Sequence, residues 1–301
     1  MILGDMGSYM STIDYVSEAY KKDALYANYV ERSLAFTTNQ LNLLNKELEE
    51  KGRSSFCAEI RVKNSDVINS EVNAFAFYIN SGVFSTCYNM DLRKYKNALQ
   101  SEYIKGVLHT NPIELPFQFI VFHEINHIRR AHAEVDNKLV SKDLYVKSTE
   151  MDADLIAVAM LYRGLQNLCR GKHVDDAEVR CLAIISVIEV LCSMKQYSGG
   201  KTYQTEGERL SDIVLKMSHL NEDPTLGMPV DVNCSSGTTK KNSIYIREFM
   251  LRIKNLWSQE QPAVELINDL FTYILSGKYS GTISAWNEIK HEIGETSKTT
   301  V

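Results

Sequence analysis

The sequence of 301 residues lacks paired cysteines, an excess of positive charge and long apolar runs. Its six cysteines form no CxxC pair and have no regular spacing. Cys181 and Cys192 lie in an apolar, helix-like run, where a free cysteine packs as a small hydrophobic side chain. The cysteine pattern therefore favours a reducing compartment.

Positive charge is not in excess either. The net charge is −5 and the isoelectric point is about 5.9, so there is no broad basic field to hold a phosphate backbone. We therefore expect no nucleic acid among the main partners.

Long apolar runs are also missing. The longest one, from Leu182 to Met194, is too short to cross a bilayer and contains Glu189. The N-terminal stretch MILGDMGSYMST lacks the positive start and the apolar core of a secretory signal. We expect a cytoplasmic protein without membrane insertion, and no feature indicates its oligomeric state.

Apolar residues make up 44% of the chain, which is enough for a sizeable core. Helical spacing from Ile13 to Leu48 predicts one or two amphipathic helices that end at Gly52. From Phe56 the pattern changes to three short strands, of which the last two, 72–79 and 82–88, are predicted to form a hairpin.

Helical patterns dominate the rest of the chain. A polar helical patch at 91–105 precedes an apolar helix that starts near Pro116. Further helices are predicted at 148–163, 176–195, 206–219, 242–257, 262–276 and 283–292. We predict a predominantly helical α+β fold with a small antiparallel sheet. Its parts are an N-terminal helical segment (1–55), a core (56–220) and a C-terminal helical extension with a disordered tail (221–301).

The predicted apolar helix contains the segment HEINH at 123–127. His123 and His127 lie about 40° apart on one helix face, where two imidazoles can reach one tetrahedral cation. Glu124 flanks them at about 60° from His127, where a base acting on metal-activated water must stand. The segment therefore predicts a zinc site with His123 and His127 as ligands.

Such a site needs a third protein ligand. His132 lies about 140° round the helix from His127, and no glycine between them offers a turn. This favours a partly exposed histidine at the helix end, near the negative end of the dipole. Glu150, in the segment STEMDADLIAVAML, is the better candidate, and Asp154 on the same helix face can orient a zinc histidine.

HEINH followed by EMDAD resembles the gluzincin pattern, HExxH with a downstream glutamate in an ExxxD helix. Two groups of that clan are similar. In the HtpX and CAAX-prenyl endopeptidase group an NAFA-type strand precedes HExxH, as VNAFAFYINSGVF does here at 72–84. The phage-exclusion peptidase Lit has a similar length, an HExxHxxxxH string and an ExxAD segment. The resemblance covers residues 56–215.

The resemblance implies a zincin-like metallopeptidase core that hydrolyses peptide bonds of a protein or peptide substrate. His123, His127 and Glu150 would hold Zn²⁺, Glu124 would be the base, and Asp154 would orient a ligand. The family's THP segment corresponds to TYQTEGERL at 202–210, so Tyr203 replaces a histidine that stabilises the oxyanion. A phenol can donate in the same way, and otherwise Arg209 or His219 must serve.

Two alternatives stay open. A regulatory or phage-defence module with a zincin fold, in which cleavage is triggered by a partner or lost, is suggested by the resemblance to Lit and to ImmA-type regulators. A helical scaffold with a vestigial site is disfavoured by Glu124, because a structural zinc site has no need of that carboxylate.

Overall fold

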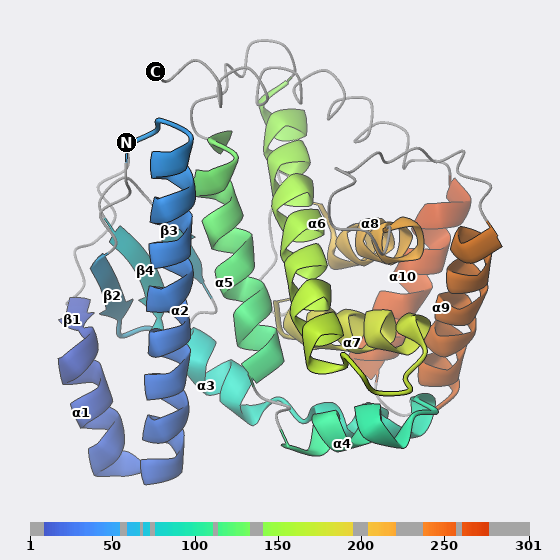
Figure 1. Cartoon of the computed structure of the whole chain (residues 1–301), viewed down its shortest axis with the longest axis horizontal. Helices are drawn as coiled ribbons and strands as arrows, with labels where there is room; N and C mark the ends of the chain where they lie inside the picture. The colour runs from blue at the N-terminus through green and yellow to red at the C-terminus, as the bar shows by residue number, and fades with distance from the viewer. Residues whose placement is uncertain are drawn as a thin grey trace.

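The computed structural model describes residues 9–54, 59–66, 69–72, 76–110, 114–132, 141–194, 204–220, 237–256 and 261–276 (Figure 1). Most of them are helical, which confirms the predicted helical α+β fold. The strands are β1 (Tyr9–Ser11), β2 (Glu59–Lys63), β3 (Ser70–Val72) and β4 (Ala76–Asn80). The helices are α1 (Thr12–Lys22), α2 (Ala24–Glu50), α3 (Ser81–Asn89), the 3₁₀ helix η1 (Leu92–Ala98), α4 (Glu102–Thr110), α5 (Glu114–Arg129), α6 (Lys142–Leu168), α7 (Asp176–Met194), α8 (Glu206–His219), α9 (Gly237–Leu256) and α10 (Gln261–Ser276).

The strands form one sheet in the order β1-β2-β4-β3. The pairs β1–β2 and β3–β4 are antiparallel, but β2 and β4 are parallel, so the prediction of an all-antiparallel sheet is wrong at that pair. The chain reverses direction at β3 and again at β4, which leaves β4 running the same way as β2. Strand β3 thus lies at one end of the described sheet.

Residues 81–89 form helix α3, where the sequence predicted the second strand of a hairpin. Val83, Phe84 and Cys87 are all buried, and their spacing places them on one helix face. Phe84 stacks on Phe117 of α5 with 5.3 Å between ring centroids. Packing of this face outweighs the strand propensity of the aromatic and β-branched residues.

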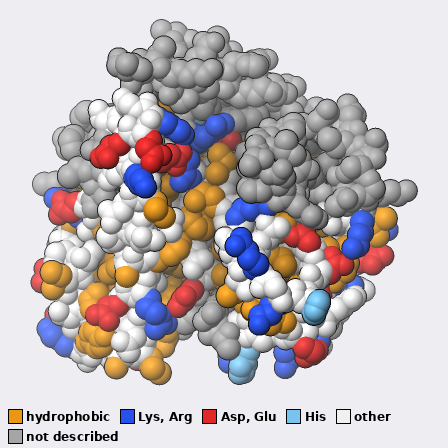
Figure 2. All heavy atoms as spheres, in the orientation of Figure 1, with side chains coloured by type: hydrophobic (Ala, Val, Ile, Leu, Met, Phe, Trp, Pro, Cys, Tyr) orange, Lys and Arg blue, Asp and Glu red, His pale blue; other side chains and the backbone are white. Residues whose placement is uncertain are grey.

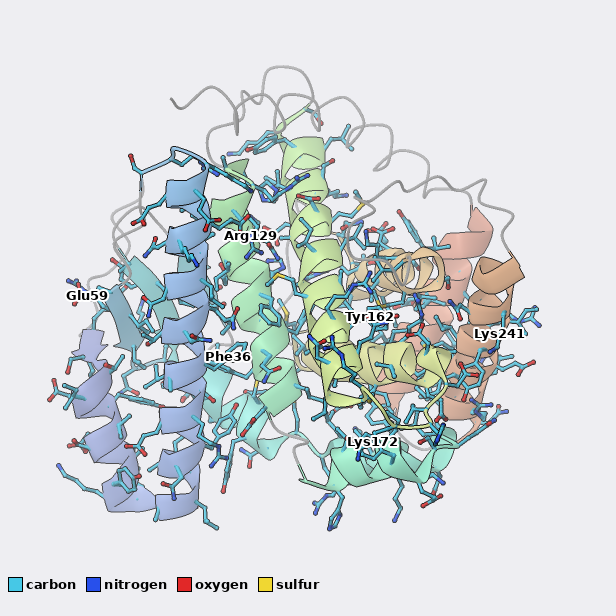
Figure 3. The ribbon with its side chains drawn as sticks, viewed as in Figure 1. Phe36, Glu59, Arg129, Tyr162, Lys172 and Lys241 are labelled. Atoms are coloured by element: carbon cyan, nitrogen blue, oxygen red, sulfur yellow. The ribbon has the colours of Figure 1, made fainter. Side chains whose placement is uncertain are left out.

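The N-terminal helices follow the predicted amphipathic pattern. Leu41, Leu44 and Leu48 of α2 are buried, and α2 packs against α5. Phe36 of α2, which is labelled in Figure 3, contacts Phe122 of α5 edge to face, with ring centroids 5.5 Å apart. Gly52 follows α2 with φ of 70°, the left-handed conformation typical of a glycine that ends a helix.

Helix α7 accounts for the longest apolar run of the sequence. It is buried along most of its length and packs against α5, α6, α8 and α9, so its apolar residues serve the core (Figure 1). No helix in the described part of the chain is long and apolar enough to cross a membrane.

Helices α2, α5 and α6 lie side by side, and α5 and α6 contact each other along much of their length (Figure 1). Figure 2 shows hydrophobic side chains along the middle of this face, over the region where Figure 1 draws α5. On the other side of α6, α8 packs against α6, α7, α9 and α10.

The predicted helices at 176–195 and 206–219 correspond to α7 and α8, and those at 242–257 and 262–276 to α9 and α10. Helix α6 begins earlier than predicted, because Ser141 caps it by accepting a hydrogen bond from the backbone of Leu144. The helix at 283–292 and the tail lie outside the described residues. The division of the chain at residues 55 and 220 stays a prediction.

Candidate metal centre

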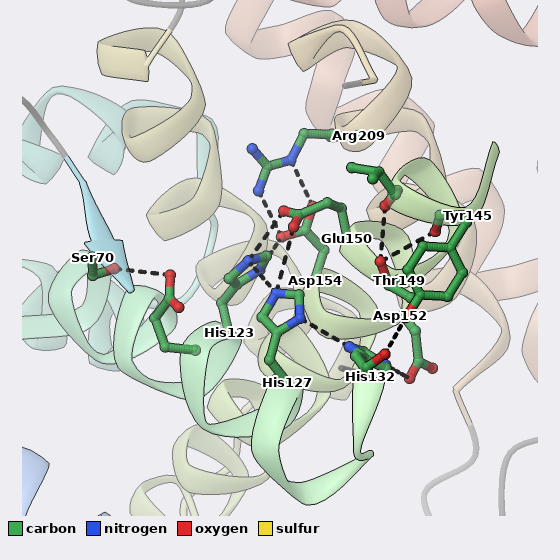
Figure 4. A network of polar contacts seen from close by, with 12 residues as sticks. Ser70, His123, His127, His132, Tyr145, Thr149, Glu150, Asp152, Asp154 and Arg209 are labelled. Carbon is green, nitrogen blue, oxygen red and sulfur yellow. Dashed lines mark hydrogen bonds and ion pairs between the residues drawn. The ribbon is translucent and has the colours of Figure 1, made fainter. Parts of the chain in front are cut away.

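Helices α5 and α6 bring the HEINH and EMDAD segments together (Figure 4). Helix α5 has Pro116 in its first turn, where the missing N–H costs nothing, and it is apolar on most faces. Its burial between other helices carries His123 into the interior, where that residue is 8% exposed. The predicted contact between the two motif helices is therefore present.

Three side chains form a cluster of donor atoms. Nε2 of His123 lies 3.2 Å from Nε2 of His127. Oε2 of Glu150 lies 3.4 Å from Nε2 of His123, and Oε1 of Glu150 lies 3.6 Å from Nε2 of His127. A tetrahedral zinc ion with ligands at 2.0–2.1 Å has ligand–ligand edges of about 3.3–3.4 Å. The spacing and chemistry of these three residues fit a zinc ion, and no fourth donor of this kind joins them in the described part of the chain.

Asp154 contacts the imidazole of His123 on the ring edge opposite the cluster. Its Oδ1 lies 2.8 Å from Nδ1 of His123, the ring nitrogen that faces away from the cluster. Arg209 of α8 donates to both oxygens of Asp154, from Nε at 2.7 Å and from Nη2 at 2.8 Å. This bidentate contact connects α8 to the cluster through Asp154 of α6.

Burial and the neighbouring charges shift the pKa values of all three residues of the cluster. Burial alone would lower the pKa of His123, but the hydrogen bond and charge of Asp154, with those of Glu150, raise it to about 10. Burial and the neighbouring His123 charge lower the pKa of His127 to about 3. Burial would raise the pKa of Glu150, but the hydrogen bond and charge of His123 lower it to about 2.

His132 is buried, at 4% exposure, so its prediction as a partly exposed helix-end residue is wrong. Helix α5 ends at Arg129, and Ala131 adopts φ of 52°, in the left-handed region where a glycine is usual. This turn carries His132 back beside His127, with 2.9 Å between their Nδ1 atoms. No sequence signal marks an alanine for this conformation.

Glu124 points toward the sheet. The hydroxyl of Ser70 on β3 donates to its Oε1 at 2.9 Å (Figure 4). Oδ2 of Asp152 on α6 lies 3.0 Å from Nε2 of His132. Ser70 and Asp152 were not singled out in the sequence, because their places in the site depend on packing between distant segments.

The remaining candidates for oxyanion stabilisation differ in position. Arg209 lies behind His123, engaged with Asp154. Tyr203 and the side chain of His219 lie outside the described residues. Their roles stay predictions.

Comparison with known proteins adds one finding. Residues 104–228 match the family model Peptidase U49. The match covers less than half of the chain but includes α5, α6, α7 and α8, and with them the donor cluster and Arg209. It supports a peptidase. No curated protein and no solved structure matches the chain.

Proposed function

We propose that this protein is a zinc-dependent endopeptidase, with His123, His127 and Glu150 as the zinc ligands. The observation that carries the proposal is the donor cluster, in which two imidazole nitrogens and the carboxylate oxygens lie 3.2–3.6 Å apart, close to the edge lengths of a zinc tetrahedron. The peptidase match over the same helices supports the peptidase part of the proposal.

The donor set favours zinc over the common hard cations. Ca²⁺ and Mg²⁺ prefer shells made of oxygen atoms, whereas two imidazole nitrogens with one carboxylate suit zinc. The same set, with an open position, is used by catalytic rather than structural zinc sites.

Zinc at this site would supply Lewis acidity, lowering the pKa of water at the open position and polarising a peptide carbonyl. Glu124, next to His123 on α5, is the proposed base. It takes a proton from the attacking water and returns it to the leaving amine. Asp154 keeps His123 in the orientation and tautomer that present Nε2 to the metal.

The proposed substrate is an extended segment of a protein. Strand β3 is at the end of the described sheet, contacts α5 and reaches Glu124 through Ser70. A peptide that pairs with the outer edge of β3 would pass close to the base. The hairpin predicted from strands 72–79 and 82–88 offers no such edge, because the chain is helical from Ser81.

Two measurements test the proposal. Protein purified without chelators is expected to contain one zinc per chain, about one equivalent by elemental analysis, and to cleave an unfolded protein substrate. Glu124→Gln should keep the zinc and lose cleavage, because the amide cannot take a proton. Wild-type protein without zinc, or equal cleavage by Glu124→Gln, would overturn the proposal.

A further inference from the structure

His127 has a partner on the side of its ring that faces away from the donor cluster. Its Nε2 points to His123 and Glu150, and its Nδ1 lies 2.9 Å from Nδ1 of His132. Beyond it, Nε2 of His132 lies 3.0 Å from Oδ2 of Asp152 on α6 (Figure 4). The side chains of His127, His132 and Asp152 thus form a hydrogen-bonded chain that leads away from the donor cluster.

The proton positions along this hydrogen-bonded chain follow from the ligand role of His127. A neutral imidazole that binds zinc through Nε2 carries its proton on Nδ1, which must then donate. Nδ1 of His132 must accept that hydrogen bond, so the proton of His132 is on Nε2. That nitrogen faces a carboxylate, which accepts it. One arrangement of protons satisfies every contact.

The hydrogen-bonded chain is buried and held in place by its surroundings. His132 is 4% exposed and Asp152 is 3% exposed. Arg130 donates from Nε to Oδ2 of Asp152 at 2.9 Å, and the hydroxyl of Tyr145 donates to the backbone carbonyl of His132. The left-handed turn at Ala131 is unfavourable for a residue with a side chain, so these contacts maintain it.

The two ligand histidines are therefore supported differently. His123 meets the Asp154 carboxylate directly, whereas His127 meets a neutral imidazole with the Asp152 carboxylate behind it. His132 is not close to the metal position, because it lies on the opposite ring nitrogen of His127 from the cluster.

Resting on the zinc-binding role proposed above, we infer that His132 is a positioning residue of the metal centre. It accepts from Nδ1 of His127 and donates to Asp152, and so fixes the tautomer and orientation that present Nε2 of His127 to zinc. If His132 served only to fill space and pair with Asp152, its replacement would leave zinc binding unchanged.

The test compares full-length wild-type protein with His132→Leu, which removes both hydrogen bonds, and His132→Gln, whose amide can accept from His127 and donate to Asp152. His173→Leu, at an exposed histidine, is the matched control. Zinc affinity is measured by competition with a chromophoric chelator, and the visible spectrum is recorded after loading with Co²⁺. Circular dichroism and thermal unfolding of the metal-free forms check the fold.

We expect His132→Leu to bind zinc roughly 10–100-fold more weakly and to show a changed Co²⁺ spectrum. His132→Gln should recover part of the affinity, and His173→Leu should match wild type. Wild-type affinity and an unchanged spectrum in a folded His132→Leu would overturn the inference while leaving the proposed function intact. Wild-type protein that binds no zinc would overturn both.

If His132→Leu does not fold, the inference is tested on the wild-type protein alone, by nuclear magnetic resonance. Long-range ¹⁵N–¹H correlation spectra of the zinc-loaded protein report which ring nitrogen carries each proton. The inference requires protonated Nδ1 in His127 and protonated Nε2 in His132. The reverse assignment in His132 would overturn it.

Discussion

The hydroxyl of Ser70 donates a hydrogen bond to Oε1 of Glu124 at 2.9 Å. The contact joins strand β3 to helix α5 across 54 residues of sequence, at the carboxylate proposed as the catalytic base. A hydrogen bond to a carboxylate favours its ionised form and limits its rotation.

Replacing Ser70 by alanine tests this contact. We expect Ser70→Ala to lower kcat roughly tenfold, since a hydrogen bond to a charged group contributes about 1.5–3 kcal/mol. Zinc content should not change, because Ser70 touches no ligand of the cluster. Ser85→Ala, at a partly buried serine of α3, is the control. Equal kcat in both variants would remove Ser70 from the site.

Zinc binding is expected to release protons. The pKa of His123 is raised to about 10 in the metal-free protein, so its ring carries a proton at pH 8 that must leave before Nε2 can bind a metal. His127, with a pKa of about 3, is already neutral. Zinc affinity should therefore rise with pH up to about 10. Titration calorimetry at pH 8 in two buffers of different ionisation enthalpy should give about one proton per zinc. Equal heats in the two buffers would contradict this.

The same shift affects the stability of the metal-free protein. The folded pKa of His123 is above the value of 6.5 expected when unfolded, so protonation favours the folded state. This contribution is fully present below pH 6.5 and is lost as the pH rises toward 10. Urea unfolding of the metal-free protein across that window measures the loss. In His123→Leu the slope with pH should become smaller.

Breaking the buried pair of Asp154 and Arg209 should be costly. Asp154 is 2% exposed and the side chain of Arg209 is 12% exposed, so removing either partner deprives a buried charge of its bidentate contact. In Arg209→Met the carboxylate of Asp154 keeps His123 as its charged neighbour. We expect Asp154→Asn and Arg209→Met each to lose about 3–5 kcal/mol of unfolding free energy. In the double variant the loss should be smaller than the sum, because the two residues interact.

An exposed ion pair provides the control for these single and double variants. Arg93 and Asp91 are both about half exposed, and we expect Arg93→Met to change the unfolding free energy by less than about 1 kcal/mol. Additive losses at Asp154 and Arg209 would show that the contact is not energetically coupled.

Asp212 of α8 is expected to weaken the fold at neutral pH. It is 3% exposed, and among the described residues neither its Oδ1 nor Oε1 of Gln204 has a hydrogen-bond partner. Burial raises the pKa of Asp212 to about 7, so ionisation opposes folding between pH 3.8 and 7 and stability falls as the pH rises through that window.

Asp212→Asn should remove this cost, because the amide cannot ionise and offers a donor where Gln204 has a free acceptor. We expect a gain on the order of 2 kcal/mol at pH 8 and a smaller one at pH 5, measured by urea unfolding. Asp66→Asn, at an exposed aspartate, should change little at either pH. A destabilised Asp212→Asn at pH 8 would contradict the account.

The residues that the sequence predicted correctly to lie together are those set by local periodicity. His123 and His127 share a helix face because helix geometry fixes residues four apart. Glu150 and Asp154 have the same spacing on α6, and apolar residues on both helices predicted that they would pack. The donor cluster follows from these two facts.

What the sequence did not predict depends on packing between distant segments. The turn at Ala131 lacks the glycine that would have marked it, so His132 was placed on a continuing helix. Helix α3 has the composition of a strand, and its packing against α2 and α5, which includes the stack of Phe84 on Phe117, favours the helix. Ser70 meets Glu124 across separate elements, which no periodicity encodes.

The contact of Arg209 with Asp154 makes the cluster depend on a helix that contains none of its ligands. A chain that keeps HEINH and EMDAD but loses the docking of α8 would have every motif residue and an unsupported His123. The amount of zinc retained during gradual denaturation would then report whether α8 is still packed against α6. Loss of the metal would indicate loss of this tertiary contact.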